Sequence, residues 1–145
     1  MRYLRGPLVA LLAFVIAVLA SSIRFSEEST AYGRVIDGGG KFSVKSYRSS
    51  YFVELTLAHF GYSSSEKANA AFDQNVAEAV EVTEITPKLD EFGKVVGRRA
   101  VVTAFNEDRT GYYACVFWTN GKSLLAITSP SLTHVLDFEK QHTVD

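Results

Sequence analysis

Few side chains in this sequence have a type and spacing suited to catalysis. The chain contains three histidines, His59, His134 and His142. His59 lies at the end of an expected strand, where a pocket shared with Tyr51 or Tyr62 would let it act as a general base. Glu54 is a further candidate partner. A histidine that only ends a half-buried strand is the alternative interpretation, so His59 is a weak catalytic candidate.

The motifs of common metal, nucleotide and nucleophile sites are missing from the sequence. No cluster of His, Cys, Asp and Glu has the spacing of metal ligands, so we expect neither a metal nor a cofactor. Gly121-Lys122-Ser123 resembles the end of a phosphate-binding loop, but Val116 stands where its first glycine is needed. The sequence also has no G-x-S-x-G, C-x-x-C or H-E-x-x-H. These observations favour a protein that is not an enzyme.

Cys115 is the single cysteine of the chain, so no internal disulfide can form. It stands within the apolar run Tyr112–Trp118, which predicts a buried and unreactive thiol. The domain therefore depends on its hydrophobic core for stability.

Aromatic residues are the candidates for a recognition surface. They make up 12% of the chain, with seven tyrosines and ten phenylalanines, and tyrosine offers a large apolar area with a polar tip. Aromatic side chains are also ordinary strand residues. We expect the binding surface to include Tyr51, Tyr62, Tyr112 and Trp118.

The first 23 residues predict an address beyond a membrane. Arg2 and Arg5 precede an uncharged run from Gly6 to Ile23, which would span about 27 Å as a helix. A hydrocarbon core is about 30 Å thick, so this length lies between a signal peptide and a short membrane anchor. Residues 1–20 are thus a signal peptide cleaved between Ala20 and Ser21, or an uncleaved signal-anchor. A buried core helix is a third interpretation.

Each fate of this segment predicts a different protein outside the cytoplasm. Cleavage releases a secreted or periplasmic domain. Retention gives a single-pass membrane protein whose N-terminus stays in the cytoplasm and whose residues 6–23 contact lipid. Residues 21–31 are polar and acidic and indicate a linker, so we expect one domain over residues 32–145.

The charge of the remainder argues against nucleic acid as a partner. Loss of Arg2 and Arg5 with the segment lowers the basic count from 15 to 13, against 16 acidic residues. Phosphate binding needs a clustered positive face, whereas Arg98-Arg99 is the only adjacent basic pair outside the first segment.

Residue patterning predicts an α+β fold with an antiparallel sheet. Ser63–Ser65 offers N-caps for a helix to about Val80, and Asn120-Gly121 is a strong hairpin signal. Ser129-Pro130-Ser131 begins a final helix. The expected strands are 41–48, 51–60, 82–89, 94–105, 112–118 and 122–128, of which the first two form a hairpin through Ser49-Ser50. The order is hairpin, helix, meander, helix, and we expect a two-layer sandwich with two helices packed on the sheet.

The central strands of the meander are apolar on both faces, so both faces need a cover. If the two helices take one face, the other is left to a curled sheet, a second subunit, a ligand or a membrane surface. We therefore expect an exported domain that binds a protein partner, a second copy of itself or a small apolar ligand through its β-rich face. The alternatives are a small hydrolase or isomerase that uses His59, and a structural accessory module of an envelope assembly.

Overall fold

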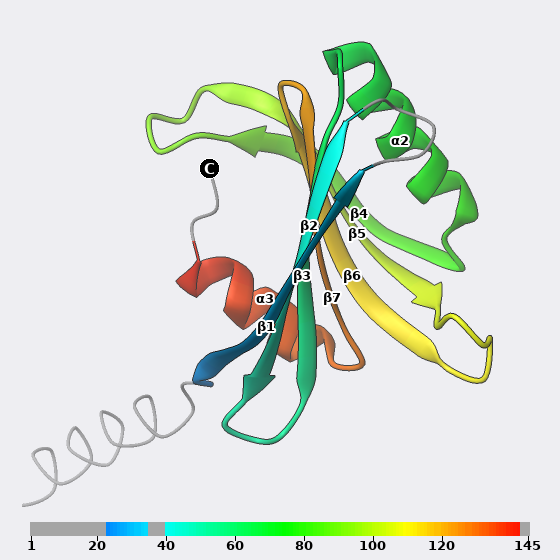
Figure 1. Cartoon of the computed structure of the whole chain (residues 1–145). Coiled ribbons are helices and arrows are strands. Elements are labelled where there is room, and N and C mark those ends of the chain that lie inside the picture. The colour runs from blue at the N-terminus through cyan, green and yellow to red at the C-terminus, as the bar shows by residue number, and fades with distance from the viewer. Residues whose placement is uncertain (1–22, 35–39, 143–145) are drawn as a thin grey trace, which may run out of the picture.

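A computed structural model describes residues 23–34 and 40–142, which form a sheet-dominated α+β fold (Figure 1). Its elements are β1 (Phe25–Arg34), β2 (Lys41–Ser49), β3 (Glu54–Gly61), α2 (Ser65–Glu78), β4 (Glu81–Leu89), β5 (Val95–Phe105), β6 (Tyr112–Asn120), β7 (Ser123–Ser129) and α3 (Leu132–Gln141). The seven strands form one antiparallel sheet in the order β1-β2-β3-β7-β6-β5-β4.

Strand β1 occupies most of residues 21–31, where we expected a polar linker, so that expectation is wrong. Its pairing with β2 runs from Phe25 opposite Ser49 to Arg34 opposite Lys41. An edge strand has one neighbour and much solvent, so it does not need an apolar sequence. Ion pairs across the strands, including Glu28 Oε1 to Arg48 Nε at 2.9 Å, accompany the ladder. The folded domain therefore begins earlier than residue 32, and Ile23 is already buried.

Local sequence patterns predict the two helix starts and the β6–β7 hairpin, and the structure confirms them. Ser64 caps α2 by accepting a hydrogen bond from the Lys67 amide, and Ser131 caps α3 in the same way from the His134 amide. Gly121 turns the β6–β7 hairpin with φ of +59°. The β2–β3 turn is longer than Ser49-Ser50, and β3 begins only at Glu54.

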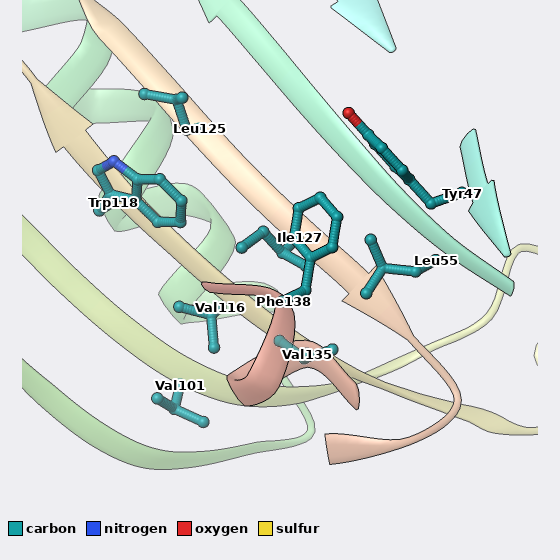
Figure 2. Packing of buried hydrophobic residues seen from close by; sticks show 9 residues of the cluster. All are labelled: Tyr47, Leu55, Val101, Val116, Trp118, Leu125, Ile127, Val135 and Phe138. Atoms are coloured by element: carbon teal, nitrogen blue, oxygen red, sulfur yellow. The ribbon is translucent and has the colours of Figure 1, made fainter. Parts of the chain in front are cut away.

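The two helices pack on opposite faces of the sheet, so the expected two-layer sandwich is not confirmed. On the α3 face, Val135 and Phe138 of α3 pack in the buried cluster shown in Figure 2. Its members are Tyr47, Leu55, Val101, Val116, Trp118, Leu125, Ile127, Val135 and Phe138. On the α2 face, Phe72 of α2 packs in a second cluster with Ala100, Val102, Phe117 and Leu124. Each helix thus covers one set of the alternating strand residues, which is why the central strands are apolar on both faces.

A half-buried ion pair and aromatic contacts hold α3 against the sheet. The Arg99 guanidinium donates from Nε to Glu139 Oε1 and from a terminal nitrogen to Glu139 Oε2, both at 2.7 Å. This bidentate contact raises the pKa of Arg99. The Phe138 ring lies 4.7 Å from that of Tyr47 and 5.1 Å from that of Phe25, so α3 also secures the first two strands.

Strand register defines two ends of the sheet. The Ile23 end holds the start of β1, the Ser49–Val53 turn and the loop between β5 and β6. The Gly121 end holds the β4–β5 turn, the β6–β7 turn and Gly61, which pairs with Ser123. In Figure 1 the β2–β3 turn lies beside the start of β1 at the bottom, and the β4–β5 turn lies far from it at upper left. The two ends differ in what covers them.

Residues 1–22 lie outside the described residues, and with them almost all of the expected export segment. Across residues 23–34 and 40–142, neither helix has the length and apolarity needed to cross a membrane.

Candidate functional site

An open cavity of about 570 Å³ lies at the Ile23 end of the sheet. It is lined by Glu54, Leu55, Thr56, Phe105, Asn106, Glu107, Asp108, Tyr113, Thr128 and Pro130. Ligand pockets typically measure about 300–1,000 Å³ and combine apolar walls with a few polar groups. This cavity has that size and that mixture.

Strand register brings three of the lining residues to the α2 face. Thr56 pairs with Thr128, which in turn pairs with Cys115 on the α2 face. Tyr113 stands two residues before Cys115 in β6, so its side chain lies on the same face. None of these residues belongs to the buried core of the α2 cluster, which is formed around Phe72. The cavity therefore opens at the Ile23 end of this face, beyond the core that α2 covers, and it also reaches Leu55 and Phe105 from the α3 face.

The β5–β6 loop forms an ordered rim of the cavity. The Asn106 amide donates to the Gly111 carbonyl at 2.9 Å, and the Gly111 amide donates to Asn106 Oδ1 at 3.1 Å. Thr110 donates to Asp108 Oδ1 from its hydroxyl at 2.6 Å and from its amide at 3.1 Å. These hydrogen bonds lower the pKa of Asp108, so its carboxyl is ionised at neutral pH.

The rim is acidic. Glu54, Glu107 and Asp108 are all exposed, and none of the ten lining residues has a basic side chain. Two cations contact lining residues: a terminal nitrogen of Arg48 lies 3.7 Å from Glu54 Oε1, and the Arg109 guanidinium lies 5.4 Å from the centre of the Phe105 ring. The three carboxylates of the rim outnumber these two cations. An ionised carboxylate accepts hydrogen bonds but cannot donate one. The site therefore favours a ligand that carries a positive charge or several donors beside an apolar part.

Cys115 lies on the same face, between the cavity and the α2 cluster. It is free and half-buried, and it accepts a hydrogen bond from the Thr128 hydroxyl at 3.5 Å. Burial raises the pKa of the Cys115 thiol to about 11, because the effect of burial outweighs the opposing effect of that hydrogen bond. The thiol is thus protonated at neutral pH and is a poor nucleophile.

The four residues expected to form the binding surface are not brought together. Trp118 is 1% exposed in the core of the α3 face, with Lys88 Nζ 4.6 Å from its ring centre, so it cannot offer a surface. Tyr62 is half-buried against the α2 cluster. Tyr112 is exposed but lies on the α3 face, where its ring stacks on Phe105 at 5.1 Å.

Tyr51 is exposed in the β2–β3 turn beside Phe52. It is not among the residues that line the cavity. The tyrosine that does line the cavity is Tyr113, the immediate neighbour of Tyr112. Alternation along β6 shows that adjacent tyrosines lie on opposite faces, but it does not say which face is left open.

His59 lies near the Gly121 end, on the α3 face. It borders a shallow hollow of about 250 Å³ lined by Tyr32, Lys41, Phe42, Ser43, His59 and Gly61. Its Nε2 lies 3.0 Å from the Ser123 hydroxyl, a partner that the sequence did not suggest. Glu54 and Tyr51 are at the other end of the sheet, and Tyr62 packs on the α2 face. The expected partners of His59 are therefore absent from its surroundings.

Within residues 23–34 and 40–142, no three side chains of His, Cys, Asp or Glu come together to hold a metal ion.

Comparisons with protein-family models, with curated proteins and with solved structures found no match to this chain.

Proposed function

We propose that this chain is a non-enzymatic binding domain that works beyond a membrane and takes a small ligand in the cavity at the Ile23 end. The address rests on the basic-then-apolar pattern of residues 1–23, and the domain is either tethered by that segment or released from it. The observation that carries the binding role is the cavity itself, which opens on the part of the α2 face beyond the α2 core.

The chemistry of the lining suggests the class of ligand. Tyr113 and Pro130 supply apolar area, while Thr56 and Thr128 add hydroxyl groups to the lining. The acidic rim disfavours anions at the mouth. An amphipathic molecule with a cationic or donor-rich head fits this arrangement better than a purely apolar one.

The test uses two adjacent tyrosines on opposite faces of β6. The neutral dye Nile red and the anionic dye anilinonaphthalene sulfonate are titrated against the full chain in detergent below its critical micelle concentration. We expect Nile red to bind and Tyr113→Ala to weaken this binding roughly tenfold, as loss of one aromatic contact does. The matched Tyr112→Ala, which reaches the cavity only by stacking on Phe105, should weaken it much less. The anionic dye should bind more weakly and gain affinity in Glu107→Gln. Equal effects of the two tyrosine variants would refute the cavity as the site.

A second candidate function follows from the hydrogen bond between His59 and Ser123. A separation of 3.0 Å suits a histidine that removes the proton of a hydroxyl nucleophile, as in a hydrolase. The residues that line the hollow include no carboxylate to orient the imidazole. Activity on a panel of simple esters that is lost equally in His59→Ala and Ser123→Ala would favour this candidate, and unchanged activity in either variant would exclude it.

A further inference from the structure

Two turns at opposite ends of the sheet share one hydrogen-bond pattern. In the β2–β3 turn, Ser49 donates to Val53 and accepts from the Phe52 amide, both at 2.9 Å. In the β4–β5 turn, Asp90 donates to Lys94 at 2.9 Å and accepts from the Gly93 amide at 3.1 Å.

The side chains that begin the turns match as well. The Ser49 hydroxyl accepts from the amides of Tyr51 and Val53. Asp90 Oδ1 accepts from the amides of Phe92 and Lys94. Phe52 therefore occupies the position that Gly93 occupies in the other turn.

The fold does not explain a phenylalanine at this position. Its backbone is left-handed, with φ of +61° at Phe52 against +77° at Gly93. Glycine adopts this conformation freely, whereas a bulky residue is strained there. Phe52 is also 82% exposed, and its neighbour Tyr51 is 58% exposed with one side of its ring edge-on to His134 at 6.1 Å. The turn thus accepts backbone strain and presents two aromatic rings to the surroundings.

The turn is tied to the point where the described chain begins. The Ser50 amide donates to the Arg24 carbonyl at 2.7 Å, and the Arg24 amide donates to the Ser50 hydroxyl at 3.3 Å. Ile23, the residue before Arg24, is the last of the uncharged run that starts at Gly6. If that run is retained in a bilayer, these hydrogen bonds hold Tyr51 and Phe52 at its surface.

We propose that Tyr51 and Phe52 insert into the interface of a lipid bilayer and hold the Ile23 end of the domain against it. The inference rests on the proposed extracytoplasmic address, with the N-terminal segment retained. Tyrosine favours the boundary between headgroups and acyl chains, and phenylalanine supplies an apolar ring that can be buried just beneath it. Exposed side chains of both signs lie at the same end, with Glu54, Glu107 and Asp108 against Arg24 and Arg109, so the proposed insertion does not require an anionic surface.

The experiment places a fluorescent reporter in each of the two turns. Trp118 is the only tryptophan and is buried, so wild-type emission serves as the background. Full chains carrying Phe52→Trp or Phe92→Trp are reconstituted in phosphatidylcholine vesicles with or without bromine atoms on the acyl chains near the headgroups. Phe92 is the matched control, because it is 86% exposed in the corresponding turn at the other end. Tyr51→Trp provides a second reporter without a left-handed backbone.

We expect Phe52→Trp and Tyr51→Trp to lose roughly half of their added emission in brominated vesicles, as for groups buried at the headgroup boundary. Phe92→Trp and the wild type should lose little. Flotation of the vesicles on a density gradient shows whether the chain is attached to them. If attached chains show similar quenching at positions 52 and 92, the proposed insertion is wrong but the tethered form stands. Chains that do not float, or that intact mass shows to be cleaved, overturn the inference and the tethered form together. Neither result affects the dye-binding test of the cavity.

Discussion

The two ends of the sheet are built differently on the same strands. At the Gly121 end, Phe117 and Leu124 are buried under α2, and the turns use Gly93 and Gly121 where the backbone is left-handed. At the Ile23 end, the α2 face opens into the Tyr113 cavity, and Phe52 takes the left-handed position. The α3 face is packed at the Ile23 end as well, so the contrast concerns the α2 face and the turns. It fits the proposed role, in which the Ile23 end gives up cover on its α2 face and relaxed turn geometry for contact with another molecule.

The largest effect should separate the covered and open parts of the α2 face. Phe72 is fully buried in the α2 cluster, so Phe72→Ala should lower the free energy of unfolding by about 3–5 kcal/mol. Tyr113 lines the open cavity, so Tyr113→Ala should lower it by less than about 1 kcal/mol. Urea unfolding monitored by Trp118 fluorescence measures both. Similar losses would mean that the cavity is part of the core.

Cys115 lies between the covered and the open parts of the α2 face, so its pKa reports how far α2 shields the sheet from solvent. Its folded pKa of about 11 is above the ordinary value of 9.0, so the unfolded chain loses this proton first as the pH rises. This difference in pKa stabilises the folded state fully below pH 9. The free energy of unfolding then falls by up to about 2 kcal/mol as the pH rises from 9 toward 11. Unfolding measured across this range should show the loss in the wild type, and Cys115→Ala should lack that part of it. A parallel decline in both proteins would show that Cys115 is solvated.

Exchange of the turn residues should change stability in opposite directions. Gly93→Ala should cost about 1 kcal/mol, because a Cβ there meets no atom within 4 Å and only the backbone is strained. Phe52→Gly should be neutral or stabilise by up to about 1 kcal/mol, since it removes strain but frees the unfolded chain. Thermal unfolding of both variants, with Phe92→Ala as the control, gives the comparison. A large loss in Phe52→Gly would show that Phe52 packs within the domain.

Features set by neighbouring residues could be predicted from the sequence. Asn120-Gly121, the serines that cap both helices, and most strand positions depend on local patterns, and the structure has them close to where they were expected. Strand β1 could not be predicted in this way, because an edge strand is stabilised by pairing with β2 rather than by its own apolar residues.

The candidate site depended on tertiary arrangement. Apolarity on both faces of β6 showed that two covers were needed, but not that each helix would supply one. The choice between Tyr112 and Tyr113 follows from the reach of α2 along the sheet, which no local pattern gives. Trp118 was expected on a surface because aromatic type does not distinguish a core position from an exposed one.

The most direct test of the contrast is hydrogen–deuterium exchange of the unmodified full chain, in phosphatidylcholine nanodiscs and in detergent micelles. The amides of Ser49, Tyr51, Phe52 and Val53 make the same hydrogen bonds as those of Asp90, Phe92, Gly93 and Lys94, while the Ser50 amide alone donates to Arg24 and is left out of the comparison. Contact of the Ile23 end with the bilayer predicts slower exchange of the first turn in nanodiscs and unchanged exchange of the second. Equal change in both turns, or change in the second alone, would contradict the account.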